Sequence, residues 1–463
     1  MRRRVAVTGI GVLTALGEGR ADTFKGLLDG RCGIGPIRAY DASSLRTRIA
    51  AELDGFAPER YATRRELRMT THGDRLAIAG AALAMTDAGL SPGSTPYAPE
   101  RSAVYAGGAK EISNPEHLLE GSLAARAEDG RADFALLGER ATSAFHPLYY
   151  VEGLQSAALF HLSHAHGFKG ANAYFHGAAD SSATAVGRGY RSIARGESDV
   201  VLAGGFDDAA SWWVMSKTDG LGLMSTRNYA PTEAYRPFGQ GRDGFVPGEG
   251  AAFLVLEELT AARSRGAAVL AEIRGFAATR ASSRLPAPDA DGRPCAPDAD
   301  GRALAAAVQQ ALREAELSPT DIDYVAAHGS ATACGDLGEA RALTRALGPA
   351  PDAVGSCVKP ALGHLGAAAG ALNAAVCALA LESGAVPPTL NLTDPDPRCR
   401  ALDWLPGHSR ELPLRHTVSL ARGLEGQQTA LVLSTPTSGT PISSNPMSGN
   451  PMSNTPIGDR RTP

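Results

Sequence analysis

Short apolar runs alternate with alanine-rich stretches along the chain, and this alternation limits the fold more than any other feature. The runs are rich in β-branched residues, as buried strands are, whereas the longer stretches repeat apolar residues at helical spacing. In the first half, strands are predicted at Val5–Thr8, Ser102–Tyr105, Asp199–Ala203 and Ala252–Leu256, and helices at Asp74–Ala88 and Ala183–Ala194. The alternation favours an α/β fold with largely buried sheets.

The same pattern restarts in the second half. Strands are predicted at Val269–Ile273, Ile322–Ala327, Val418–Ala421 and Ala430–Leu433, and helices at Arg302–Glu314, Asp336–Leu347 and Gly366–Leu381. We therefore expect two similar halves, residues 1–257 and 258–434. Ser282–Gly301 is expected to be a long loop, and residues 435–463, rich in Pro, Ser and Asn, a disordered tail.

Composition excludes several classes of protein. The formal net charge of −4 gives no basic field for nucleic acid or anionic lipid. The most apolar stretch, Gly366–Val386, consists largely of Ala and Gly and contains Asn373, so a buried core helix is favoured over a membrane span. Six cysteines form no CxxC pair, so we expect neither a disulfide framework nor a zinc site, and a reducing cytoplasm fits.

Four motifs follow one another along the chain: VAVTGIGVLTALG near the start, then segments at Arg236–Gly250, His328–Glu339 and Val358–Gly370. In this order and spacing the chain resembles elongating β-ketoacyl-acyl-carrier-protein synthases, which include the ketosynthase and chain-length-factor pairs of type II polyketide synthases. The resemblance covers about residues 3–434. It implies a thiolase-like, internally duplicated five-layered αβαβα fold, a dimer, and no cofactor beyond the phosphopantetheine of an acyl carrier protein.

The resemblance also supplies candidate site residues. His328 and His364 match the two family histidines that help decarboxylate malonyl-carrier protein, and Lys359 and Glu339 match the pair that supports them. Two neutral imidazoles can donate hydrogen bonds to the enolate oxygen that forms. Thr332, in the same motif as His328, is a substrate-binding candidate. The alternative is that both histidines are hydrogen-bonded core residues.

The cysteine nucleophile of the family is missing. The matching segment, Tyr174–Ala183, reads YFHGAADSSA, and Ala179 falls on the cysteine position. Alanine has no lone pair, so covalent capture of an acyl group there is impossible. The nearby or motif-borne candidates are not expected to substitute for it: Ser181, Ser182, His176, Cys334 and Cys357.

A second departure lies near the C-terminus. Catalytic relatives carry a G-F-G-G loop, whereas this chain reads Leu420-Ala-Arg-Gly-Leu-Glu-Gly426. Leu424 replaces the Phe that gates the site, and Glu425 replaces a Gly. The frame L-A-R-G-x-x-G resembles that of chain-length factors.

Two functions remain open. One is a chain-length-factor-like subunit that pairs with a cysteine-bearing ketosynthase and shapes its acyl tunnel. The other is a malonyl-carrier-protein decarboxylase, against which Asp180 counts, because like charges about 4 Å apart repel by several kcal/mol.

Two further clusters stand out in the sequence, one aromatic and one of histidines. The aromatic cluster Phe145–Tyr150 is predicted to be ordinary core, with a tunnel or partner face as the alternative. His161, His164 and His166 do not have a standard ligand spacing, so no metal site is expected there.

Overall fold

The computed structural model describes residues 2–91, 95–110, 114–281 and 298–436. Most of the predicted loop at 282–301 and all but the first two residues of the predicted tail at 435–463 lie outside these ranges. Within them, ten strands of one large sheet form two five-stranded units that are joined where Val5–Val7 pairs antiparallel with Ala271–Ile273.

The two units have the same topology. The first runs β6-β5-β7-β8-β1 and the second β11-β10-β14-β15-β9, so each places its strands in the same chain order. In both units, the three strands at the outer end pair parallel with one another. The fourth strand pairs antiparallel with the third, and the fifth pairs antiparallel with the fourth. Their bounds are β1 Val5–Thr14, β5 Ser102–Gly108, β6 Asn172–His176, β7 Val200–Asp207, β8 Gly250–Glu258, β9 Ala271–Arg280, β10 Tyr324–Ala326, β11 Val354–Ser356, β14 His416–Arg422 and β15 Gln427–Ser434.

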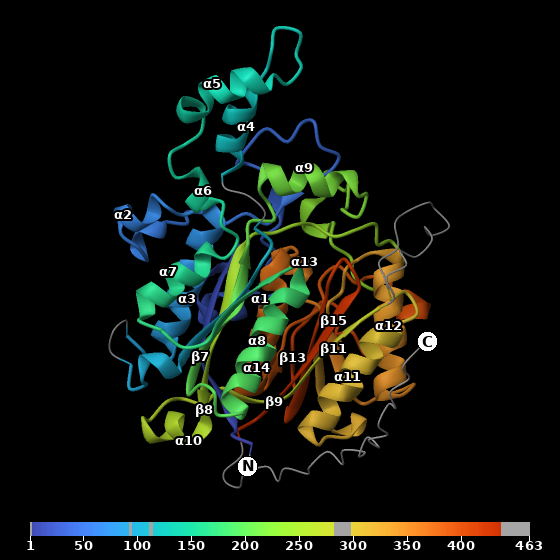
Figure 1. Ribbon diagram of the computed structural model, residues 1–463. Coiled ribbons are helices and arrows are strands. Elements are labelled where there is room, and N and C mark those ends of the chain that lie inside the picture. Colours follow the sequence, from blue (N-terminus) through green and yellow to red (C-terminus); the bar gives the residue numbers. More distant parts are fainter. Residues whose placement is uncertain (1, 92–94, 111–113, 282–297, 437–463) are drawn as a thin grey trace, which may run out of the picture.

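Helices cover both faces of each unit and produce the five layers of a thiolase-like fold (Figure 1). Helices α8 (Ala179–Ala194) and α14 (Ala369–Ser383) pack against each other between the two units. On the outer faces lie α3 (His72–Asp87) against the first unit and α11 (Arg302–Ala315), with α12 (Ala333–Leu347) packed on it, against the second. The expected duplicated α/β architecture is confirmed.

The chain also contains further helices and short strands beside these elements. Helices α4, α5 and α6 form an excursion between β5 and β6 that projects from the top of the molecule in Figure 1. The bounds are α1 Arg20–Leu28, α2 Arg64–Leu67, α4 Pro115–Ala124, α5 Phe134–Ala144, α6 Tyr149–Glu152, α7 Ala157–His166, α9 Trp212–Gly220, α10 Leu259–Ser264, α13 Lys359–Leu362, β2 Gly17–Glu18, β3 Gly35–Pro36, β4 Ile49–Ala50, β12 Ala385–Val386 and β13 Arg410–Glu411.

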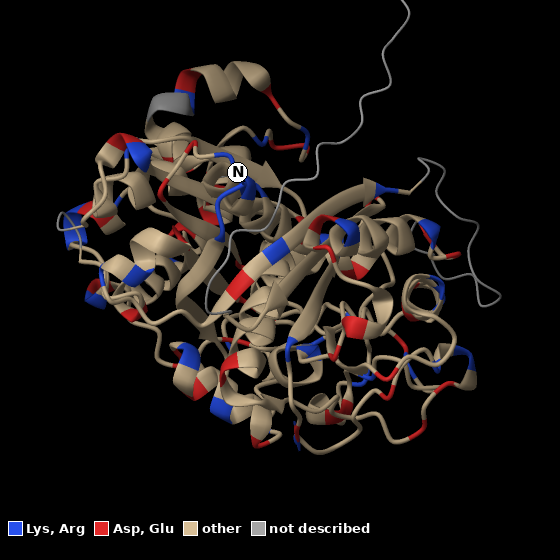
Figure 2. Cartoon of the chain, turned by 90° about the horizontal axis from the view of Figure 1, so that it is seen from below, with Lys and Arg blue, Asp and Glu red and all other residues tan. Residues whose placement is uncertain are grey.

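The structure agrees with the predicted core helix. Among the described residues one segment, Gly366–Ser383, is long and apolar enough to cross a membrane, but 83% of it is buried. It is α14 with the turn before it, packed between the two sheet units. Basic and acidic residues are interspersed along the elements seen in Figure 2, so no single sign dominates that view.

Three expectations need correction. Cys334 is disulfide-bonded, which the scattered cysteines did not predict, because spacing in sequence does not show which thiols the fold brings together. Tyr150 is 78% exposed and Phe145 only half-buried, so the predicted aromatic core is wrong. Helix α8 begins at Ala179, four residues before the predicted Ala183, which places the nucleophile position inside its first turn.

Close packing between α8 and β9 yields a stability prediction. A methyl group at Gly187, in the interior of α8, would overlap the ring of Phe276. Gly187→Ala should therefore lower the free energy of unfolding by about 1–3 kcal/mol, although alanine is the better helix former. Denaturant unfolding measures this change.

The matched control is Gly138→Ala in α5, where nothing lies within 4 Å of the added methyl group. Here helix propensity acts alone, and the variant should be unchanged or up to about 1 kcal/mol more stable. Equal stability of the two variants would contradict the packing argument.

Candidate functional site

The turn between β6 and α8 presents the nucleophile position to the interior. Ala179 is the first residue of α8 and is fully buried. A side chain at Gly370, at the start of α14, would overlap the carbonyl oxygen of Ala179, so the two helix N-termini lie directly against each other. The free N–H groups of a helix N-terminus stabilise an anion, but the methyl group of Ala179 offers none.

The candidate serines and cysteines are hydrogen-bonded, protonated or disulfide-bonded, and the candidate histidine points to the surface. The Ser181 hydroxyl donates to the carbonyl of Ala178 at 2.7 Å, and the Ser182 hydroxyl accepts the N–H of Ala371 at 2.9 Å. Burial raises the pKa of the Cys357 thiol to about 12, which keeps it protonated. His176 lies exposed at the end of β6, and Cys334 is in a disulfide. None of these groups replaces the missing thiolate.

His328 lies in a loop that a buried carboxylate anchors. The loop follows β10, and Glu339 of α12 accepts the N–H of His328 at 2.6 Å and the N–H of Gly329 at 2.8 Å. Glu339 therefore fixes the backbone of the loop, while the imidazole itself is held by other groups.

Hydrogen bonds also set the tautomer of both imidazoles. Nδ1 of His328 lies 3.1 Å from Nζ of Lys359 and accepts the N–H of Arg422 at 3.3 Å. Nδ1 of His364 accepts the N–H of Gly366 at 3.0 Å. In each neutral ring the proton therefore belongs on Nε2. Burial, reinforced by the nearby Lys359 charge, lowers the pKa of both histidines well below its ordinary value.

The two rings and Lys359 form one compact group. The imidazole centroids of His328 and His364 are 5.4 Å apart, with the rings at 74°. Lys359 is buried, and its ammonium also donates to the backbone carbonyl of His328. Desolvation lowers the pKa of Lys359 to about 8. The arrangement offers two neutral N–H donors to an oxygen that develops negative charge.

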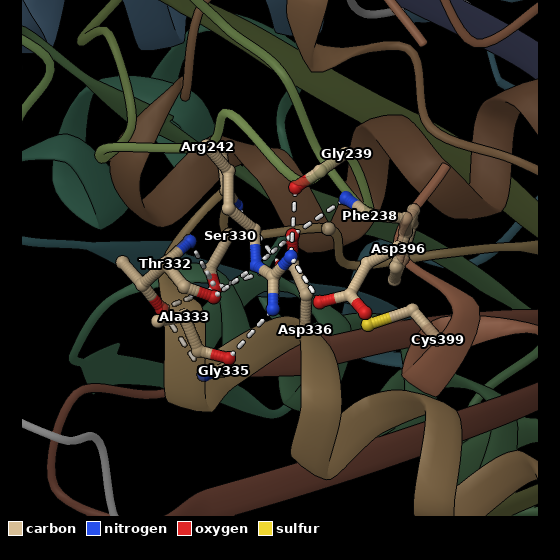
Figure 3. A network of polar contacts seen from close by, with 12 residues as sticks. Phe238, Gly239, Arg242, Ser330, Thr332, Ala333, Gly335, Asp336, Asp396 and Cys399 are labelled. Atoms are coloured by element: carbon tan, nitrogen blue, oxygen red, sulfur yellow. Dashed lines mark hydrogen bonds and ion pairs between the residues drawn. The ribbon is translucent and has the colours of Figure 1, made fainter. Parts of the chain in front are cut away.

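A buried ionic network supports the same loop from behind (Figure 3). Arg242 donates to the carbonyls of Thr332 and Ala333 at 3.2 and 3.1 Å, and to Asp396 at 2.9 Å. Asp336 accepts the N–H of Phe238 at 2.7 Å and that of Ala331 at 3.0 Å. The network binds the Arg236–Gly250 motif to the His328–Glu339 motif.

Thr332, a predicted substrate contact, is occupied within the protein. Its hydroxyl accepts the N–H of Gly335 at 3.2 Å as the cap of α12 and lies 2.8 Å from the Ser330 hydroxyl. These bonds give Thr332 a structural role.

The loop between β14 and β15 approaches the start of α8. Leu424 is 52% exposed, and Glu425 points outward to an ion pair with Arg280 at 3.6 Å. A side chain at Gly423 would overlap the Asp180 carboxylate, so glycine lets the loop pass directly over it. Arg422 in turn donates its backbone N–H to His328, which connects the nucleophile turn to the histidines.

Asp180 is a buried carboxylate in the first turn of α8. Its Oδ1 has no hydrogen-bond partner within the described part of the chain. Burial raises the pKa of Asp180 to about 6, so most of these carboxyls are ionised at pH 7. A negative charge beside the nucleophile position disfavours an anionic malonyl group.

Sequence reasoning missed a cavity of about 610 Å³ near the site. Its wall carries the His72–Glu249 pair, 2.7 Å apart, and Lys110, which forms a buried ion pair with Asp74 at 2.8 Å. The Asp207 carboxylate, also in this wall, accepts the N–H of Ala367 at 2.7 Å, just after His364. These groups come from separate segments, so no local motif could have indicated them.

Comparison with known proteins identifies the family. Residues 2–262 match the model of the β-ketoacyl synthase N-terminal domain, and residues 270–393 match that of the C-terminal domain. The chain is 33% identical over 434 residues to 3-oxoacyl-[acyl-carrier-protein] synthase 2 of Coxiella burnetii, covering 94% of this chain and 99% of that protein.

Relatives from polyketide synthases are equally similar. The ketoacyl synthase alpha subunit of the tetracenomycin polyketide synthase of Streptomyces glaucescens is 35% identical over 444 residues, covering 94% of this chain and 97% of that one. The solved ishigamide ketosynthase/chain length factor superposes with a TM-score of 0.79 at 29% identity, covering 94% of this chain and 100% of that one. The chain is a thiolase-fold protein, and it belongs to the β-ketoacyl synthase family.

The raised pKa of Asp180 predicts how stability depends on pH. An aspartate has a pKa near 3.9 in an unfolded chain, so between about pH 4 and 6 the unfolded state ionises first and the folded state loses stability. Asp180→Asn should raise the free energy of unfolding at pH 7.5 by about 2–3 kcal/mol and change it little at pH 4.

Denaturant unfolding at both pH values measures this difference. The exposed Asp352→Asn is the control and should show no such pH-dependent gain. An Asp180→Asn variant that tracks the wild-type protein at both pH values would contradict a buried, poorly compensated charge.

Proposed function

We propose that this chain is a non-catalytic, chain-length-factor-like subunit of a type II polyketide or related synthase, paired with a cysteine-bearing ketosynthase. The observation that carries the proposal is the methyl group of Ala179 at a buried helix N-terminus, with the neighbouring candidate serines and cysteines hydrogen-bonded, protonated or in a disulfide. The chain keeps the fold around the acyl-binding position but lacks the sulfur atom that would attack the acyl thioester.

A partner is supported by the surface. Strand β6 is the edge of the sheet and pairs only with β5 among the described strands, which leaves one side open to another chain. The segment between β5 and β6, which contains helices α4 to α7, exposes large apolar side chains: Leu119, Leu123, Phe134, Tyr150, Val151, Leu154 and Phe160. Such a surface is typical of a protein–protein interface.

In this role the subunit would complete the dimer and shape the far end of the partner's acyl tunnel. It would meet a phosphopantetheinylated acyl carrier protein in the cytoplasm and would need no resident cofactor.

Co-expression with the candidate ketosynthase tests the assembly. We expect a one-to-one heterodimer by mass in solution, because a partner would cover the open edge of β6 and the exposed apolar side chains beside it. A homodimer that persists unchanged in the presence of the ketosynthase would refute the pairing.

Restoring the nucleophile tests the role of Ala179. Ala179→Cys should gain the mass of an acyl group when incubated with acyl-carrier protein, because the helix N-terminus stabilises a thiolate there, whereas the wild-type protein should gain none. Intact-mass analysis makes the comparison. Ala183→Cys, one turn further along the same buried helix face, is the control and should stay unmodified. Acylation of the wild-type protein would contradict the proposal.

The decarboxylase is the second candidate, and the two neutral imidazoles favour it. Decarboxylation needs donors for the enolate oxygen but no nucleophile, and Nε2 of His328 and of His364 supply such donors. Incubation of the isolated chain with malonyl-carrier protein distinguishes the two functions. Acetyl-carrier protein formed by the wild-type chain, and lost in His364→Ala, would establish the decarboxylase; its absence supports the non-catalytic subunit.

A further inference from the structure

Three side chains outside the candidate site converge in the helical excursion above the sheet. His117 belongs to α4, His146 precedes α6, and Glu152 is the last residue of α6. The ligand atoms of these three residues all lie within 4.8 Å of one another. Nδ1 of His117 is 3.1 Å, and Nδ1 of His146 is 3.5 Å, from separate oxygens of the Glu152 carboxylate.

The Glu152 carboxylate is in an electrostatically unusual position. Its side chain is only 3% exposed, and the two imidazoles are the polar partners recorded for it in the described part of the chain. A buried carboxylate requires a compensating positive charge, because desolvation of an unpaired ion costs several kcal/mol. Either a bound cation or a proton on one of the imidazoles supplies that charge, and the geometry of the three side chains bears on which.

The orientation of His146 indicates which kind of cation fits. Its Nδ1 accepts the N–H of Leu148 at 3.3 Å, so this nitrogen carries a lone pair instead of a proton. The same atom lies 3.5 Å from a Glu152 oxygen. Because this nitrogen has one lone pair, binding an ion together with Glu152 would replace the hydrogen bond from Leu148.

We propose that His117, His146 and Glu152 bind one divalent transition-metal ion of the zinc class. Two imidazole nitrogens and one carboxylate oxygen form a donor set that suits Zn²⁺ and, more tightly, Cu²⁺, whereas Mg²⁺ and Ca²⁺ prefer oxygen ligands alone. Tetrahedral zinc with bonds of about 2.0–2.1 Å places its ligand atoms about 3.4 Å apart, close to the two measured nitrogen–oxygen distances.

Small adjustments complete the site. The imidazole rings of His117 and His146 are stacked, with centroids 4.4 Å apart. The His146 side chain is 36% exposed, so its ring can rotate toward the ion, and solvent can occupy the remaining coordination positions.

The ion would cross-link two helices of the excursion. It would join α4 to α6, which frame the exposed side chains of Leu119, Leu123 and Tyr150. A second contact, from the Trp212 indole N–H to Glu116 at 2.7 Å, already ties α4 to α9. This inference goes beyond the proposed function and does not depend on it, since the three ligands lie away from Ala179 and the two histidines of the site.

Metal titration of the tag-free, full-length chain tests the proposal. After chelator treatment and dialysis, isothermal titration with ZnCl₂ should give one binding event per chain. Titration with CoCl₂ should produce visible absorption bands of a low-symmetry Co²⁺ site. His117→Ala and Glu152→Gln should each weaken Zn²⁺ binding at least tenfold.

Controls separate the site from folding and from other histidines. His408→Ala, on an exposed loop of the second half, should bind Zn²⁺ like the wild-type protein. Thermal unfolding without metal should be similar for the wild-type protein and His117→Ala, and Zn²⁺ should raise the midpoint only where the three ligands are intact. No Zn²⁺ uptake by the wild-type chain, or equal uptake by His117→Ala, would overturn the proposal; the first result would mean that a protonated histidine supplies the positive charge.

Discussion

The geometry of the site depends on two carboxylates that project from one turn of α12. Asp336 and Glu339 are both buried, and between them they accept the backbone N–H groups of Phe238, His328, Gly329 and Ala331. Hydrogen bonds from backbone N–H groups to ionised carboxylates are among the strong ones in proteins. They hold an irregular loop rigid, and so present His328 to His364 and Lys359 without any ligand.

This support explains how a site can lose its nucleophile and keep its shape. The turn at Ala179 is positioned by contact between α8 and α14, and the imidazoles by Lys359 and by backbone N–H groups of Arg422 and Gly366. None of these interactions involves a side chain at position 179. Replacing a thiol by a methyl group there removes the nucleophile but changes the packing of the turn little.

Much of the fold and site could be predicted because it is encoded locally. Strand and helix periodicity located the elements of both halves. The motifs identified His328, His364, Lys359 and Glu339, and the fold brings these residues together. Other features were missed because they depend on separated segments. Examples are the disulfide at Cys334, the exposure of Tyr150, and the Glu152 carboxylate between two imidazoles.

The sequence by itself determined that the chain is a duplicated α/β protein of this family and that position 179 carries no nucleophile, because periodicity, motif order and residue identity are properties of the chain. Only the tertiary structure decided the protonation of the two imidazoles, the burial of Asp180, and the outward direction of Glu425. Those properties follow from desolvation and from hydrogen-bond partners, and both are fixed only when distant segments pack together.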